Sequence, residues 1–117
     1  MKVAVTVWDG WISPVFDACR EGLLLEIDGT DIVPLATIDL DSRSPRRKVE
    51  ILVGYEVHTL ICGAISEPLR REALFGGLVV IGFVSGKIDS VIQAFVSGKL
   101  PTPTLTMPGY VQPQSKP

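Results

Sequence analysis

The sequence predicts an α/β domain in which helices cover both faces of a mixed five-stranded sheet, a three-layer α/β/α arrangement. Two patterns indicate this fold class. Residues 2–40 read as three strands with no helix between them, and residues 44–98 read as helices that alternate with two short buried strands. A chain of 117 residues builds one core and not two. We therefore expect a single domain over residues 1–100.

The first half of the chain reads as a strand followed by a hairpin. In residues 2–8, "KVAVTVW", three valines alternate with other residues, which is typical of a strand. Residues 22–28 and 31–40 flank Gly29, so "DGTD" predicts a hairpin turn between two antiparallel strands. Pro34 has no N–H to donate to a neighbouring strand, and it therefore places the second strand of the hairpin at the sheet edge.

The second half reads as three helices and two strands. Ser44 as N-cap and Pro45 as first helical residue predict a helix over residues 44–55, and "VHTLIC" at 57–62 predicts a buried strand. A second helix is expected after Ser66, a second buried strand at 78–84, and a third helix at 87–98. In the third helix, the apolar side chains recur at i, i+3, i+4, i+7 and i+8: Ile88, Val91, Ile92, Phe95 and Val96.

Right-handed crossovers place the fourth predicted strand beside the first and the fifth outside it, which gives the order 3-2-1-4-5. In open sheets of this kind, ligands bind at the carboxyl ends of the strands, at the point where the chain leaves two neighbouring strands in opposite directions. Two loops reach that crevice: residues 9–19, "DGWISPVFDAC", and residues 62–66, "CGAIS".

Composition narrows the function classes. The net charge of -2 offers no electrostatic argument for binding nucleic acid or an anionic membrane. The first ten residues lack a cleavage site typical of a signal peptide, and no apolar run is long enough to span a bilayer, so we expect a cytoplasmic protein with reduced cysteines. Five prolines in residues 101–117 predict a flexible tail after the domain.

Three stretches together resemble a known family. They are "KVAVTVWDGWISPVFDACREGLLLEIDG", centred on residues 13–17, then "VHTLICGAISEPLRREAL", and "GFVSGKIDSVIQAFVSGKL" followed by "MPG". In this order and spacing, over residues 2–109, the chain resembles the dinitrogenase iron–molybdenum cofactor biosynthesis proteins. The resemblance implies a ribonuclease H-like fold. It also implies that the protein carries an iron–sulfur or iron–molybdenum cluster or its precursor, that it is not an enzyme, and that its partners are cluster donor or acceptor proteins.

The residues of the crevice fit such a cargo in part. Cys62 offers a thiolate, and Cys19 offers a second one if the first loop folds back. Gly63 lets a ligand approach the backbone, and the N–H groups leading to Ser66 at a helix start favour anionic charge. The first loop adds further crevice residues, of which Trp11 stacks on a ligand if its indole is exposed: Asp9, Trp11, Ser13, Phe16 and Asp17.

Each of these residues also has a purely structural interpretation. Cys62 is as well explained as a small core residue, because free cysteine is among the most buried residue types. His58, the single histidine, fits a packed core position better than a metal ligand. Two cysteines are fewer than the four that usually hold a cluster. A homodimer would bring four together, or the cluster would keep inorganic ligands.

Two other function classes are compatible with the fold class that the sequence predicts. A nuclease of this fold class needs several carboxylates at the strand ends, and only Asp9 and Asp17 lie in the right loop. A non-catalytic interaction module without metal is the stronger alternative. The basic run of residues 43–48 and the proline-rich tail are its candidate contact segments.

Overall fold

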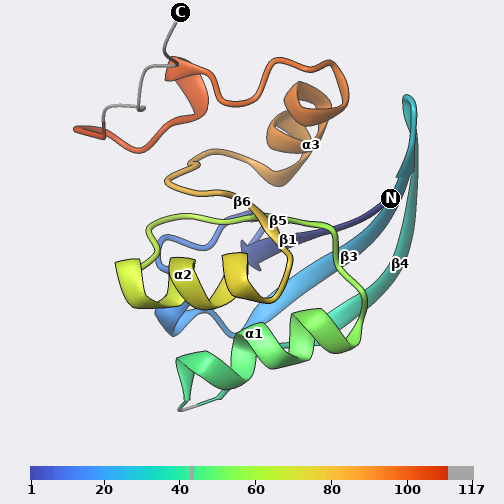
Figure 1. The fold of residues 1–117 in the computed structure, drawn as a ribbon. Coiled ribbons are helices and arrows are strands. Elements are labelled where there is room, and N and C mark those ends of the chain that lie inside the picture. Colours follow the sequence, from blue (N-terminus) through green and yellow to red (C-terminus); the bar gives the residue numbers. More distant parts are fainter. Residues whose placement is uncertain (43, 111–117) are drawn as a thin grey trace, which may run out of the picture.

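The computed structural model describes residues 1–42 and 44–110, and it shows a mixed α/β domain with an open sheet (Figure 1). The strands are β1 (Lys2–Trp8), β2 (Trp11–Ile12), β3 (Glu21–Asp28), β4 (Asp31–Asp39), β5 (Thr59–Ile61) and β6 (Val79–Ile81). The α-helices are α1 (Pro45–Gly54), α2 (Glu67–Phe75) and α3 (Ile88–Val96), and two 3₁₀ turns are η1 (Phe16–Ala18) and η2 (Pro103–Leu105). None of the helices in this part of the chain has the length and apolar character needed to cross a bilayer.

The sheet has six strands, so the prediction of five was wrong. The longer strands lie in the order β4-β3-β1-β5-β6, and β1 is antiparallel to β3 and parallel to β5. The missed strand, β2, pairs antiparallel with the end of β1 through Val7–Ile12 and Trp8–Trp11. It forms because Asp9 and Gly10 both have positive φ, at 52° and 81°, which turns the chain back on itself within two residues.

Helices cover both faces of the sheet. α1 and α2 lie on one face and α3 lies on the other, as Figure 1 shows. The alternation in β1 divides the core accordingly: Ala4 packs with Leu52 of α1 and Leu69 of α2, whereas Val3 and Val5 pack with the apolar face of α3. The sequence therefore builds two apolar layers from one strand.

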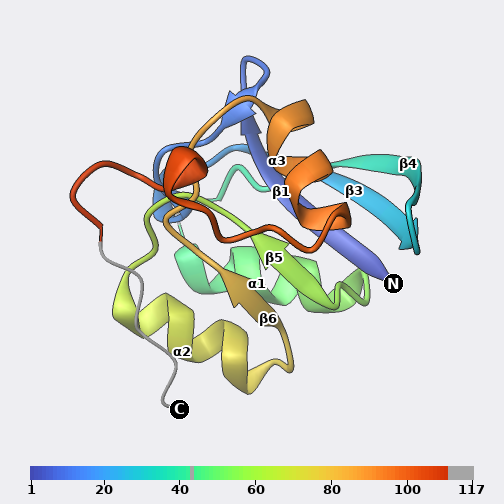
Figure 2. The ribbon, with the colours of Figure 1, turned by 90° about the horizontal axis from the view of Figure 1, so that it is seen from above.

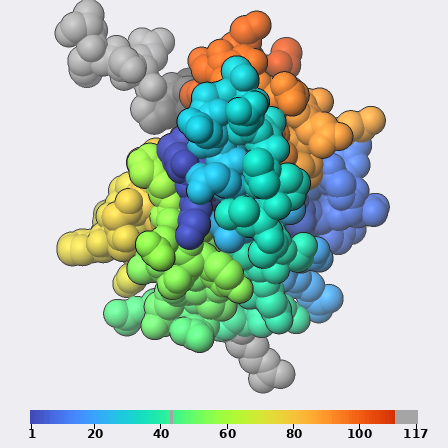
Figure 3. All heavy atoms as spheres, turned by 90° about the vertical axis from the view of Figure 1, so that its right-hand side faces the viewer, coloured from blue at the N-terminus to red at the C-terminus, as the bar shows by residue number. Residues whose placement is uncertain are grey.

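The predicted hairpin is confirmed. β3 and β4 pair antiparallel around the 28–31 turn, and Pro34 lies in β4, which pairs with β3 alone at one edge of the sheet. Most of β4 is exposed, and the hairpin, in cyan and teal, covers much of the side of the molecule seen in Figure 3.

The C-terminal segment, residues 101–110, is folded against the rest of the domain. Its backbone pairs with the loop that follows β6 through a bridge between Val84 and Thr106. Figure 2 shows the segment, in red, returning from α3 towards that loop. Residues 111–117 of the predicted tail, and Arg43 of the basic run, lie outside the described residues.

Candidate ligand-binding crevice

The loop after β1 closes over the end of β5. The Phe16 N–H donates to the carbonyl of Ala64 at 2.7 Å, and the Ala64 N–H donates to the carbonyl of Pro14 at 2.8 Å. Gly63 permits this approach, because a Cβ at this position would collide with the carbonyl oxygens of Ser13 and Pro14 and lie 2.7 Å from the Pro14 carbonyl carbon. The space at Gly63 is therefore taken by the protein's own backbone.

The start of α2 is likewise engaged within the chain. Asp17 accepts a hydrogen bond from the Ser66 N–H at 3.1 Å and another from the Ser66 hydroxyl at 2.7 Å. The carboxylate therefore lies where the helix dipole favours a negative charge. Asp17 and Ser66 are brought together as neighbours, and their contact connects the first loop to α2.

Both cysteines lie in the core between the sheet and the α1–α2 layer. Cys62 is fully buried and Cys19 is 2% exposed. Burial raises the pKa of Cys62 to about 12 and the pKa of Cys19 to about 11, the latter despite the nearby positive charge of Lys48. Both groups are therefore neutral thiols at pH 7, and neither presents a thiolate to the crevice in this conformation.

His58 lies at the opposite end of β5 from Cys62, and it is exposed rather than packed in the core as predicted. Its Nδ1 lies 2.7 Å from the Thr59 hydroxyl. Across residues 1–42 and 44–110, no three His, Cys, Asp or Glu side chains gather into a group that could hold a metal ion.

An open pocket of about 470 Å³ lies beside the closed loop, at the carboxyl ends of β1 and β6, and we call it the crevice pocket. The loop after β1, the loop after β6 and the C-terminal segment all contribute to its wall. Its lining residues are Trp8, Trp11, Ile12, Pro14, Val84, Ser85, Gly86, Thr104 and Met107. A second hollow of about 320 Å³ shares Trp8 and Pro14 and adds Ser13, Val15 and Ala18.

Exposed indoles and one cation mark this region. Trp8 is 65% exposed and Trp11 is 47% exposed, an unusual amount of aromatic surface for a strand end. The Lys87 Nζ lies over the Trp11 ring, 5.7 Å from its centroid, and the N–H of Ile88 donates to the carbonyl of Gly10 at 3.0 Å. These contacts connect the start of α3 to the β1–β2 turn.

The predicted crevice residues are therefore only partly brought together. Trp11 lines the crevice pocket and Ser13 lines the neighbouring hollow, whereas Phe16 is fully buried and Asp9 lies exposed in the β1–β2 turn. The sequence pattern did not point to two further parts of the pocket wall, the loop after β6 and Met107. The position of the loop after β6 could have been predicted, because β6 is parallel to β5 and the carboxyl ends of both strands meet the same edge of the sheet.

Comparisons with known proteins identify the fold. No protein-family model and no curated protein sequence matches the chain. Among solved structures, PH0822 is similar with a TM-score of 0.80 at 20% identity, covering 93% of this chain and 96% of its own. The apo form of the orange protein from Desulfovibrio gigas has a TM-score of 0.72 at 17% identity, with 90% and 94% covered.

A further similar structure is a protein from Methanocaldococcus jannaschii whose name assigns it provisionally as a dinitrogenase. It has a TM-score of 0.65 at 23% identity, and the alignment covers 85% of this chain and 90% of that chain. At these identities the likeness establishes a shared fold over nearly the whole chain.

Proposed function

We propose that the protein is a carrier that binds an iron–sulfur or iron–molybdenum cluster, or a precursor of one, in the crevice pocket, and that it is not an enzyme. The observation that carries the proposal is an open pocket with two exposed indoles at the carboxyl ends of the strands. The shared fold with a provisionally named dinitrogenase and with the orange protein supports it. Membership of the cofactor biosynthesis family, a ribonuclease H-like fold and a cytoplasmic location belong to the same proposal.

We further propose that the cluster keeps its own inorganic ligands while bound. The two thiols are buried and neutral, so ligation by Cys62 or Cys19 requires the core to open. The pocket instead offers polarisable aromatic faces, and the ammonium of Lys87 lies over the ring of one of them, Trp11; both features suit the surface of an anionic metal sulfide. Binding without covalent ligands also leaves the cargo free to pass to an acceptor protein.

Anaerobic titration with tetrathiomolybdate, a small anionic metal sulfide, tests the proposal. Trp8 and Trp11 are the two tryptophans of the chain and both line the pocket, so binding should quench the intrinsic fluorescence. Lys87→Glu should weaken binding about tenfold, since it reverses the charge beside the site. Lys99→Glu, an exposed control with the same charge change, should bind like the wild type.

Reconstitution with iron and sulfide tests how the cargo is held. We expect a coloured protein, and we expect Cys62→Ala to keep the colour as long as circular dichroism shows that it is folded. Loss of colour in a folded Cys62→Ala variant would instead make the thiolate a ligand. A wild type that neither quenches nor takes up metal would refute the carrier proposal.

The second candidate is an interaction module with no bound metal. It is favoured by Phe75, which is 95% exposed at the rim of a groove of about 690 Å³ between α1 and α2. A second copy of the chain is the simplest occupant to test. Sedimentation of the wild type and of Phe75→Ser decides this: a dimer lost in the variant supports the module, and a wild-type monomer argues against a homodimer.

A further inference from the structure

The C-terminal segment is held to the loop after β6 by backbone pairing. The Ser85 N–H donates to the Leu105 carbonyl at 2.9 Å, and the Met107 N–H donates to the Phe83 carbonyl at 2.8 Å. The segment thus runs antiparallel to residues 83–85, beyond the end of β6. This attachment is separate from the strand pairing of β1, β5 and β6.

Two side-chain contacts reinforce this pairing. Leu105 packs over Gly86, where an added Cβ would lie 2.7 Å from the Leu105 Cδ2, and it also contacts the apolar layer under α3. The ring of Tyr110 stacks on Phe83 with centroids 4.1 Å apart and planes 2° from parallel. Gly86 has φ +131°, and with no side chain it accommodates both the turn and the leucine.

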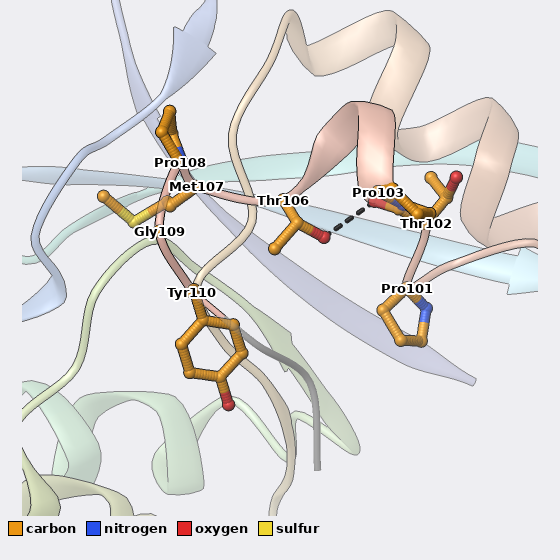
Figure 4. Close-up of a pocket in the computed structure, with 8 residues that line it drawn as sticks. All are labelled: Pro101, Thr102, Pro103, Thr106, Met107, Pro108, Gly109 and Tyr110. Carbon is orange, nitrogen blue, oxygen red and sulfur yellow. Dashed lines mark hydrogen bonds between the residues drawn. The ribbon is translucent and has the colours of Figure 1, made fainter. Parts of the chain in front are cut away.

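The segment borders two hollows. Pro101, Thr102, Met107 and Tyr110 are among the residues that line a hollow of about 410 Å³, where the Thr106 hydroxyl donates a hydrogen bond of 2.7 Å to the Thr102 carbonyl (Figure 4). Figure 4 shows the Met107 side chain pointing away from Pro101. Met107 and Thr104 also line the crevice pocket together with Trp8 and Trp11.

We infer that the C-terminal segment is a detachable wall of the binding site, which contacts the cargo through Met107 and Thr104 and controls its release by docking on the loop after β6. This inference rests on the proposed carrier function. Half-buried Met107 adds a polarisable thioether to the pocket lining that also holds the two indoles. When Leu105 leaves Gly86, that lining is lost and the cargo is exposed on one side.

A pair of charge variants tests the contact. Met107→Glu and Met107→Lys lose the same methionine packing but differ in the sign of the new charge. Their affinities for an anionic cargo should therefore differ only if residue 107 faces the cargo. With tetrathiomolybdate as probe, we expect Met107→Lys to bind at least about tenfold more tightly than Met107→Glu, and the gap to shrink at high salt. Val33→Glu and Val33→Lys, on exposed β4, are the matched remote pair and should bind alike.

Leu105→Ala tests the control of release. We expect the probe to dissociate about tenfold faster, measured by stopped-flow tryptophan fluorescence. Hydrogen exchange of the Ser85 and Met107 amides in the absence of probe should show both amides losing protection, which reports docking directly.

The outcomes separate the two proposals. A wild type that binds the probe, combined with equal affinities for the Met107 pair and an unchanged dissociation rate in Leu105→Ala, overturns the inference and leaves the carrier function standing. A wild type that does not bind the probe refutes both the carrier function and the inference, and the amide exchange then reports only how the segment packs. A higher affinity of Met107→Lys than of Met107→Glu for the probe, together with faster release in Leu105→Ala, supports the inference.

Discussion

Gly63→Ala is the most informative single substitution, because it acts on the contact that closes the first loop over β5. The new Cβ would collide with the Ser13 and Pro14 carbonyl oxygens, which are backbone atoms and cannot rotate away. Relief requires the loop to move, at the expense of the Phe16–Ala64 and Ala64–Pro14 hydrogen bonds and of the Asp17–Ser66 contact. Each backbone bond contributes about 1 kcal/mol, and the bonds to the carboxylate contribute somewhat more.

We therefore expect Gly63→Ala to lower the free energy of unfolding by about 3 kcal/mol, measured by urea denaturation followed by circular dichroism. Gly54→Ala is the matched control. Gly54 ends α1, and no atom of residues 1–42 or 44–110 outside its own surroundings lies within 4 Å of an added Cβ, so alanine there should stabilise the protein by about 0.5–1 kcal/mol. A Gly63→Ala variant as stable as the wild type would show that the loop is not held as described, and would reopen Gly63 as a point of ligand approach.

Three further predictions concern buried polar groups. The pKa values of Cys19 and Cys62 are raised from 9.0 to about 11 and about 12, so their contribution to stability is complete below pH 9 and declines as the pH rises towards those values. Both thiols should resist Ellman's reagent at pH 8 until urea unfolds the chain, and rapid reaction of the native protein would contradict their burial. Thr6→Val should stabilise the protein by about 1 kcal/mol in the same denaturation assay, because the fully buried Thr6 hydroxyl has no hydrogen-bond partner among the residues that the structure describes; a destabilised variant would reveal a partner for it. Lys48 is 1% exposed, and its ammonium donates to the carbonyls of Cys19 and Leu40, the second at 2.8 Å. Lys48→Met should cost about 2 kcal/mol, since it leaves both carbonyls unpaired, and an unchanged denaturation midpoint would argue against that role.

Local patterns in the sequence were enough to predict most of the secondary structure. The valine alternation of β1, the hairpin around Gly29 and the apolar periodicity of α3 each depend on residues within a few positions of one another. The edge position of β4 followed from the missing N–H of Pro34. A resemblance carried by short motifs also suggested the class of fold that the solved structures share.

The site itself was decided by contacts between distant parts of the chain. Ser13 and Pro14 meet Gly63, and Val84 meets Thr106, so neither the closed loop nor the C-terminal wall could be derived from local periodicity. The same contacts placed Met107 in the crevice pocket and left Cys62 fully buried. Residue type and spacing determined which segments become strands and helices, because those depend on backbone preference and on a repeating apolar face. Tertiary packing decided which side chains are exposed to a ligand, because exposure depends on what the rest of the chain covers.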